Sequence, residues 1–187
     1  GAVLSALKLL LDTCVLYPTV MREMLIGAAR ADAFEPRWSA RIMEEWRRAV
    51  LKHGEAAGVE VMGEGALLNA AFPKASVRYT EAQEARFWLP DPSDTHVIAA
   101  AVIGGADGIV TMNNKDFPAG ILAEEGLTRV NPDALLYGFW QAQPEMISHV
   151  AQGVLDKANA LSGQGWTMKE LFKKARMPRL GKALVSG

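Results

Sequence analysis

Residues 89–111, "LPDPSDTHVIAAAVIGGADGIVT", decide the fold class. The acidic, proline-containing start at residues 91–94 is typical of a helix N-terminus, and the apolar residues behind it recur at helical spacing. Gly104 and Gly105 end this helix, and residues 109–111 predict a short buried strand. A helix, a glycine turn and a short apolar strand are typical of the crossover unit of a parallel sheet. The sequence therefore predicts an α/β protein.

The segments before and after this stretch extend the same pattern. Residues 8–11 predict an apolar strand that runs directly into Asp12. Pro18 suits the first turn of a helix, and Ser39 is a candidate cap for a second helix. We further expect a connection at residues 34–38, a helix at 59–71, a short strand at 76–79, a helix at 122–126 and a strand at 128–130.

The character of the chain changes near residue 132. Residues 133–141, 144–161 and 167–175 all predict helices, and no further strand is expected. We therefore divide the chain into an α/β domain at residues 1–132 and a helical extension with a basic tail at residues 133–187.

The basic tail begins at Gln164 and has one acidic residue, Glu170, against six basic residues. Such a tail is either a solvated chain end or a contact surface for nucleic acid or an acidic partner. The candidate nucleic-acid contacts are Lys169, Lys173, Lys174 and Arg176.

Composition narrows the possible classes of protein. Half of the residues are apolar and 22% are charged, which is enough to build a sizeable core. No apolar run approaches the roughly 20 residues that a membrane-spanning helix needs, and the first residues lack the basic region of a signal peptide. The single cysteine, Cys14, excludes an internal disulfide and fits a reducing compartment. We therefore expect a cytoplasmic protein with no membrane partner.

Other common sites have no support in the sequence. There is no P-loop, no GxGxxG after a strand, no HExxH and no GxSxG. The three histidines lie far apart, which disfavours a zinc site. His96 is interpreted as a surface or helix-start residue.

Four acidic residues fall at the ends of predicted elements. Asp12 and Asp116 follow strands, Asp94 opens a helix, and Glu45 or its neighbour Glu44 lies on the helix that Ser39 begins. Each has a structural interpretation as well: Asp12 and Asp94 as caps, Asp116 as a turn residue, and Glu45 as the partner of Arg41 at i−4. Asp91, which precedes a proline, is interpreted as structural.

Taken together, the four acids favour a metal site. Ligands of parallel sheets bind at the carboxyl ends of the strands, and carboxylates held close together raise one another's pKa unless a cation offsets the charge. All-oxygen ligands suit Mg²⁺ or Mn²⁺, which support phosphodiester hydrolysis. Thr111 and Asn113 would orient a carboxylate, water or substrate without adding charge.

The periodicity of the helix after Ser39 favours Glu45 over Glu44. Glu45 lies at the edge of the face that Ile42 and Trp46 mark as buried, whereas Glu44 shares its side with Arg48. The expected catalytic and metal-binding set is therefore Asp12, Glu45, Asp94 and Asp116.

With these residues identified, the chain resembles the PIN-domain family, and among its members the VapC-type toxins of toxin–antitoxin pairs. The resemblance covers roughly residues 7–132 and rests on four stretches in order: "LLLDTCVLYP" with Asp12, "SARIMEEWRRAVL" with Glu45, "DPSDTHVIAAAV" with Asp94, and "IVTMNNKDFP" with Thr111, Asn113 and Asp116.

The resemblance implies a three-layer α/β/α fold with a mainly parallel sheet and a ribonuclease activity that depends on one or two Mg²⁺ or Mn²⁺ ions. It also implies frequent dimerisation, here as a homodimer, and a cognate antitoxin, usually a small DNA-binding protein whose tail blocks the active site. The helical extension is not part of the minimal domain, and it offers a surface for the antitoxin, for the dimer or for RNA. Two alternatives stay open: a non-catalytic module that binds RNA or protein, and a nuclease directed at DNA.

Overall fold

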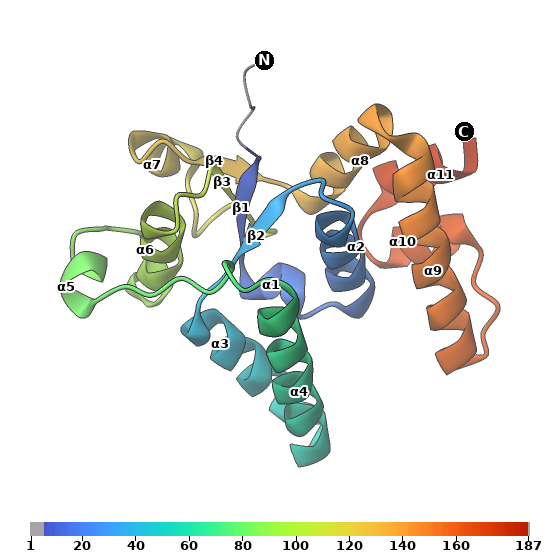
Figure 1. Ribbon diagram of the computed structural model, residues 1–187, viewed down its shortest axis with the longest axis horizontal. Coiled ribbons are helices and arrows are strands. Elements are labelled where there is room, and N and C mark those ends of the chain that lie inside the picture. Colours follow the sequence, from blue (N-terminus) through green and yellow to red (C-terminus); the bar gives the residue numbers. More distant parts are fainter. Residues whose placement is uncertain (1–5, 187) are drawn as a thin grey trace. The chain divides into compact units, whose positions relative to one another are not determined.

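A computed structural model describes residues 6–186 of the protein (Figure 1). One four-stranded parallel sheet has the strand order β2-β1-β3-β4. The strands are β1 (Lys8–Leu11), β2 (Glu35–Arg37), β3 (Gly108–Val110) and β4 (Thr128–Val130). Leu10 pairs with Arg37 on one side and with Ile109 on the other, so β1 lies inside the sheet.

The position of β1 explains its sequence. Leu9, Leu10 and Leu11 are all buried, as expected for a strand with neighbours on both sides. Because β1 and β3 are parallel neighbours, their carboxyl ends lie at the same edge of the sheet. The backbone N–H of Asp12 still donates to the carbonyl of Val110, at 3.2 Å, so the pairing continues one residue beyond the strand. Residues that follow β1 and β3 are thereby brought together.

The chain forms two compact units. The sheet unit contains residues 6–17 and 34–129, and the helical unit contains residues 18–33 and 130–186. The helices of the sheet unit are α1 (Thr13–Leu16), α3 (Ala40–Val50), α4 (Glu55–Ala71), α5 (Glu81–Glu84), α6 (Thr95–Ile103) and α7 (Ala119–Glu124), with 3-10 turns at Leu51–His53 and Pro92–Asp94.

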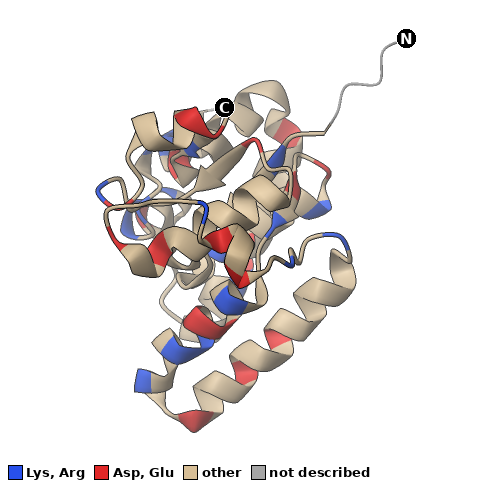
Figure 2. Ribbon diagram, turned by 90° about the vertical axis from the view of Figure 1, so that its left-hand side faces the viewer, with Lys and Arg blue, Asp and Glu red and all other residues tan. Residues whose placement is uncertain are grey.

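Two helices of the sheet unit matter most for the site. α6 packs against β1 and β3, and its alanines are buried, which permits close approach to the strands. α3 packs against α1 and α4; Ser39 caps it by accepting from the Ile42 N–H at 3.1 Å. Figure 2 shows charges of both signs on α3 but only acidic residues on α4, at the bottom of the view.

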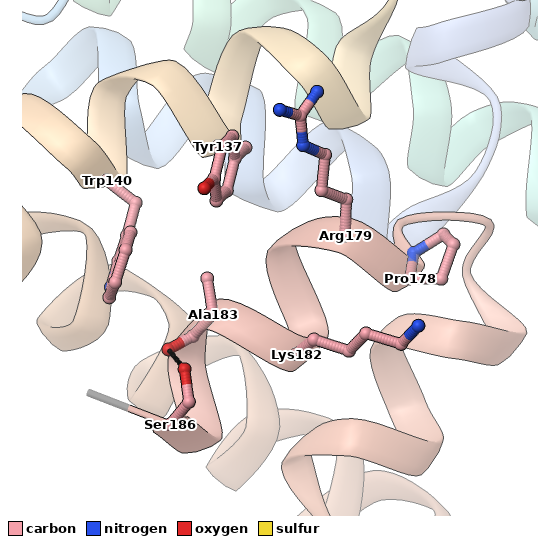
Figure 3. A pocket seen from close by; sticks show the side chains of 7 residues that line it. All are labelled: Tyr137, Trp140, Pro178, Arg179, Lys182, Ala183 and Ser186. Carbon is pink, nitrogen blue, oxygen red and sulfur yellow. Dashed lines mark hydrogen bonds between the residues drawn. The ribbon is translucent and has the colours of Figure 1, made fainter.

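The helical unit contains α2 (Thr19–Arg30), α8 (Pro132–Ala142), α9 (Pro144–Ser162), α10 (Met168–Lys174) and α11 (Pro178–Ser186). α2 packs against α8 and α9, and the Lys157 ammonium lies 2.9 Å from the Glu23 carboxylate. α11 packs against α8 and α10. An open groove of about 620 Å³ is lined by residues of α8 and α11 (Figure 3).

The α/β/α class and the helical C-terminal region are confirmed. Two expectations are wrong. Residues 34–38 are not a plain connection, because they contain β2, whose Glu35 N–H donates to the Leu7 carbonyl at 2.7 Å. Residues 76–79 are not a strand: Ser76 makes only an isolated bridge with Trp38, since no second pair follows it.

The domain boundary at residue 132 stays a prediction. Contacts within the chain divide it differently, because α2 joins the helices that follow residue 130 although it lies early in the sequence. Within residues 6–186, no helix combines the length and the apolar composition that crossing a membrane requires. The expectation of no signal peptide concerns residues of which the first five lie outside the described part of the chain.

Candidate metal centre

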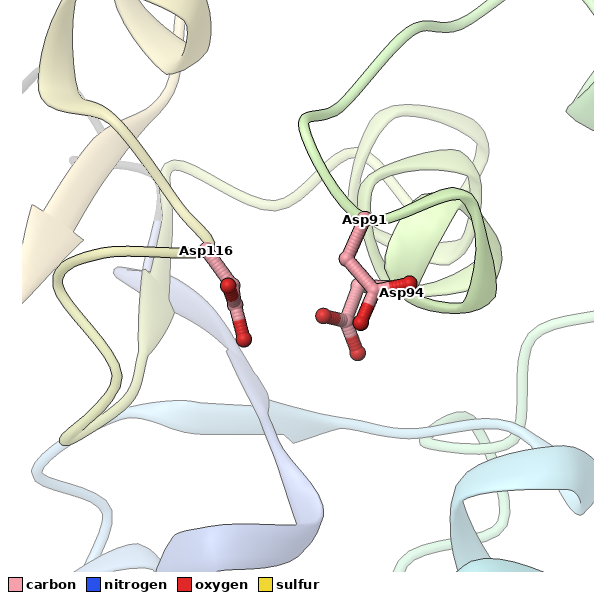
Figure 4. A group of neighbouring side chains, drawn as sticks. All are labelled: Asp91, Asp94 and Asp116. Carbon is pink, nitrogen blue, oxygen red and sulfur yellow. The ribbon is translucent and has the colours of Figure 1, made fainter.

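Three aspartates form a compact acid group in the sheet unit: Asp91, Asp94 and Asp116 (Figure 4). One carboxylate oxygen of each lies within 4.8 Å of those of the other two. Asp91 and Asp94 come from the turn that leads into α6, and Asp116 comes from the loop after β3. The crossover from α6 to β3 thus places acids that are far apart in sequence on one site.

Local hydrogen bonds explain the shape of the turn before α6. The Asp91 carboxylate accepts from the N–H and the hydroxyl of Ser93, at 2.9 and 2.7 Å, and so caps the 3-10 turn. Pro92 occupies the first position of that turn, where no backbone donor is needed. Asp94 is the last residue of the turn and stands immediately before α6. Its side chain makes no capping bond in α6 and is directed to the acid group.

The loop after β3 is fixed at several points. Asn113 Nδ2 donates to the Asp116 carboxylate at 2.6 Å, and Asn113 Oδ1 accepts from the Asp116 N–H at 3.3 Å. Phe117 is fully buried behind the loop, and the Arg129 guanidinium donates to its carbonyl at 3.0 Å. Asn113 therefore acts as a clamp that orients Asp116.

Asp12 lies at the end of β1 in a dense set of hydrogen bonds. Its carboxylate accepts from the Thr111 hydroxyl at 2.9 Å, from the Thr13 N–H at 2.8 Å and from the Cys14 thiol at 3.3 Å. The Thr111 hydroxyl in turn accepts from the Asn113 N–H at 3.0 Å. One chain of hydrogen bonds thus joins the ends of β1 and β3.

Glu45 lies on the same side as Asp12, and Glu44 does not. A Glu45 oxygen accepts from the Thr13 hydroxyl at 3.3 Å, and the other lies against Nε2 of His96. Glu44 instead pairs with Arg47 and Arg48, and the Arg47 hydrogen bond lowers its pKa to about 2. Glu45 is therefore the glutamate that lies toward Asp12, and its place in the catalytic and metal-binding set stays a prediction.

The electrostatics of the site show the cost of grouping acids. Burial and the charges of Asp91, Asp12, Asp116 and Glu45 raise the pKa of Asp94 to about 6. Burial also raises the pKa of Asp12, although the hydrogen bonds from Thr111 and Cys14 act in the opposite direction. The Cys14 thiol has a pKa of about 11, because it is buried and lies beside Asp12, so it stays a donor. A bound cation would remove the repulsion that raises the carboxylate pKa values.

The donor set fits a hard divalent cation. The acid group offers carboxylate oxygens only, which are the ligands that Mg²⁺ and Mn²⁺ prefer and that zinc in structural sites usually does not use. Asp94 and Asp116 of the predicted set belong to this group. Asp12 and Glu45 stand outside it but close enough to raise the pKa of Asp94.

Two residues differ from their sequence interpretation. Asp91, interpreted as structural, caps the 3-10 turn, but it is also the third member of the acid group. The sequence could not show that Asp91 belongs to the acid group, because an aspartate at a helix start is typical of a cap as well as of a metal ligand. His96 lies at the start of α6, as one of its two sequence interpretations has it, but it is not at the surface: it is completely buried against Glu45.

The predicted nucleic-acid contacts lie in the helical unit. Lys169, Lys173 and Lys174 are exposed on α10, and Arg176 is exposed just after it. Lys174 lies 5.0 Å from the centre of the Trp166 ring. Their role as nucleic-acid contacts stays a prediction.

Comparison with known families finds a match that covers most of the sheet unit together with α2 of the helical unit. The sequence profile of the PIN domain matches residues 8–115, which is more than half of the chain. The protein therefore belongs to the PIN-domain family, whose members are generally metal-dependent nucleases. No match was found among curated proteins or among solved structures.

Proposed function

We propose that this protein is a metal-dependent endoribonuclease that hydrolyses phosphodiester bonds of RNA. The observation that carries the proposal is the acid group of Asp91, Asp94 and Asp116, beside Asp12; Asp12, Asp91 and Asp94 lie within the stretch that matches the PIN domain, and Asp116 follows its last residue. A phosphodiester is an anion, and a group of acids repels it unless cations intervene. The acid group therefore suits a nuclease only together with divalent metal.

The residues that would hold one or two Mg²⁺ or Mn²⁺ ions are the acid group with Asp12 and Glu45. When bound, such an ion makes a water molecule more acidic and offsets charge on the scissile phosphate. The chain itself supplies orientation. Thr111 holds the carboxylate of Asp12, Asn113 holds that of Asp116, and the buried His96 ring lies against one oxygen of Glu45.

The decisive test is cleavage of a labelled single-stranded RNA in Mn²⁺ by the wild type and by Asp94→Asn. We expect the variant to be at least about a hundredfold slower, because the removed carboxylate belongs to the ligand set. Chelation of the metal should abolish cleavage by the wild type. Equal rates for the two proteins would overturn the assignment, and cleavage of the matched DNA strand at the same rate would overturn the preference for RNA.

The neighbouring glutamates provide a matched pair of variants. Glu45→Gln should slow cleavage, because Glu45 faces Asp12 and Asp94. Glu44→Gln changes the same chemical group one residue away, where it pairs with Arg47 and Arg48, and should leave the rate within about twofold. The variant Asp91→Asn tests separately whether the residue that caps the 3-10 turn also serves as a metal ligand.

We infer further that the nuclease is the toxin of a toxin–antitoxin pair, acts in the cytoplasm and forms a homodimer. Membership of the PIN-domain family supports this inference, as does the resemblance to VapC-type toxins. The expected partner is a small DNA-binding antitoxin. Induced expression of the wild type should arrest bacterial growth, whereas Asp94→Asn should not, and co-expression of a small DNA-binding protein from the adjacent gene should restore growth. Unimpaired growth with active nuclease would contradict the toxin role.

A further inference from the structure

The groove between α8 and α11 combines aromatic and basic side chains. Tyr137 and Trp140 enter it from α8, and Arg179 and Lys182 from α11 (Figure 3). None of the seven residues that line it is acidic. Its volume of about 620 Å³ falls in the range of roughly 300–1,000 Å³ that is common for ligand sites. The groove lies within the helical unit, and the nuclease site makes no use of it.

The two aromatic rings of the groove are nearly parallel. The Tyr137 and Trp140 ring centres are 6.1 Å apart and their planes differ by 18°. They stand one helical turn apart on α8, and both are only partly buried. Gln141 donates to the Tyr137 hydroxyl at 3.3 Å and restrains that ring. Partly exposed aromatic rings are the surfaces on which the bases of single-stranded nucleic acids stack.

The two basic side chains are held at the same groove. The Arg179 guanidinium carbon lies 4.1 Å from the centre of the Tyr137 ring, so a cation–π contact keeps its charge there. The Asp133 carboxylate accepts from the N–H groups of Arg179 and Leu180, at 3.0 and 2.9 Å, which fixes the start of α11 against α8. Lys182 is exposed one turn further along α11. The groove is therefore preorganised and positively charged.

The sequence around the groove favours a polyanion. Residues 164–186 hold six basic residues and one acid, Glu170, whose carboxylate accepts from the Thr167 hydroxyl at 2.8 Å. This excess of positive charge attracts either a nucleic acid or an acidic peptide. The parallel rings distinguish the two, because nucleobases have π faces that stack on Trp and Tyr whereas Asp and Glu side chains have none.

We propose that the groove between α8 and α11 binds single-stranded RNA. A base stacks on the ring of Trp140, whose neighbour Tyr137 already carries the Arg179 guanidinium over its ring, and Arg179 and Lys182 contact the adjoining phosphates. The choice of RNA over DNA rests on the proposed nuclease function. The stacking ring and the basic side chains support binding of a single-stranded nucleic acid independently of that function. The groove thus gives the helical extension a role in holding substrate, separate from the chemistry of the acid group.

The test measures binding without cleavage. The Asp94→Asn protein is titrated in EDTA against a fluorescent single-stranded RNA of about twelve nucleotides, a length within the range of about 4–16 nucleotides that one OB fold covers, and anisotropy gives the affinity. Trp140→Ala should weaken binding about tenfold, whereas Trp140→Phe, which keeps an aromatic face, should stay within about threefold of the parent. The double change Arg179→Ala with Lys182→Ala should weaken binding and reduce its dependence on salt.

The matched control removes the same charge elsewhere. Lys74 and Arg78 are exposed in the sheet unit, and their double change to Ala should leave the affinity and the salt dependence near those of the parent.

Equal losses in the groove and control variants would overturn the proposal. So would a poly-glutamate peptide that binds as tightly as RNA and does so independently of Trp140, because the groove would then fit an acidic protein partner. Thermal unfolding checks each variant, and the exposed Arg179 and Lys182 keep the test valid if Trp140→Ala is unstable.

The experiments distinguish a failure of the proposed RNA binding in the groove from a failure of the proposed nuclease function. Cleavage by the wild type in Mn²⁺ together with groove variants that bind RNA normally would overturn only the groove. Groove-dependent RNA binding by a wild-type chain that cleaves nothing in Mn²⁺ would overturn only the nuclease.

Discussion

At the scale of single residues, the pKa of the Asp94 carboxyl is raised both by burial and by the negative charges of the acids around it. Its pKa of about 6 means that a proton competes with a cation for this carboxylate near neutral pH. Above about pH 7 Asp94 is deprotonated, and Mn²⁺ affinity should be constant. As the pH falls below about 6 the affinity should drop by about tenfold per unit, because binding must displace one proton. Calorimetric titration of Mn²⁺ between pH 5 and 8 measures this directly.

The control for this pH dependence is Asp94→Asn, which has no proton to lose at that position. Its residual Mn²⁺ affinity should be weaker and should depend less on pH across the same range. An affinity of the wild type that is unchanged from pH 8 to pH 5 would show that Asp94 is not a ligand.

Thr111 tests whether the hydrogen bond to Asp12 holds the ends of β1 and β3 together. Thr111 is 1% exposed, and its hydroxyl donates to Asp12 and accepts from the Asn113 N–H. Thr111→Val keeps the shape but removes both bonds, and should cost about 1–3 kcal/mol of unfolding free energy. Thr111→Ser keeps the hydroxyl and should cost less than half as much. Chemical denaturation compares the two, and equal losses would assign the effect to packing alone.

These residues also show what sequence can and cannot predict about the site. Asp12, Asp94 and Asp116 are predictable because they stand at the ends of elements whose own signals are local. Asp91 has the same local signals, but only the closeness of the loop after β3 makes it part of the acid group. His96 depends entirely on packing, since a histidine at a helix start is equally plausible exposed or buried.

At the scale of elements, the same distinction separates predicted from unpredicted structure. α3 carries a cap and apolar periodicity in its own residues, and α6 follows an acidic, proline-containing turn and consists largely of apolar residues, so both are predictable. β2 is not, because Glu35, Pro36 and Arg37 have little preference for a strand and become one only by pairing with β1. α4 lies between these cases: its apolar residues occur on all sides, so the helix is predictable but its buried face is not.

Two adjacent leucines of α4 identify its buried face. Leu68 is 4% exposed in the sheet unit, where α4 packs against α3, whereas Leu67 is 69% exposed. Leu68→Ala should lower the unfolding free energy by about 2–5 kcal/mol, because it leaves a cavity. Leu67→Ala should change it by no more than about 0.5 kcal/mol. Urea unfolding of the two variants makes the comparison, and a large loss at Leu67 would mean that this face is covered by another molecule.

At the scale of the whole molecule, the chain order and the packing order differ. α2 follows β1 and α1 in sequence, yet it packs with α8 and α9, which lie more than a hundred residues later. The helical unit therefore cannot be completed until the C-terminal helices are present. A fragment that ends at residue 132 would retain α2, whose Met24 and Leu25 are buried in the full chain, without the C-terminal helices against which α2 packs.

Gly27 tests this packing of α2 against α9. A β-carbon at Gly27 would lie 2.4 Å from a methyl carbon of Val150, which is too close for any real contact. Gly27→Ala should therefore destabilise the protein by about 1–3 kcal/mol, despite the better helix propensity of alanine.

Gly153→Ala is the matched control on α9: nothing lies within 4 Å of its new methyl group, so it should stabilise by about 0.5–1 kcal/mol. Adding Val150→Ala should recover part of the loss at Gly27 but none elsewhere, because the two side chains would no longer collide. Thermal unfolding of the wild type, the two single variants Gly27→Ala and Val150→Ala and their double variant measures the coupling. Independent effects of the two changes would contradict the contact between α2 and α9.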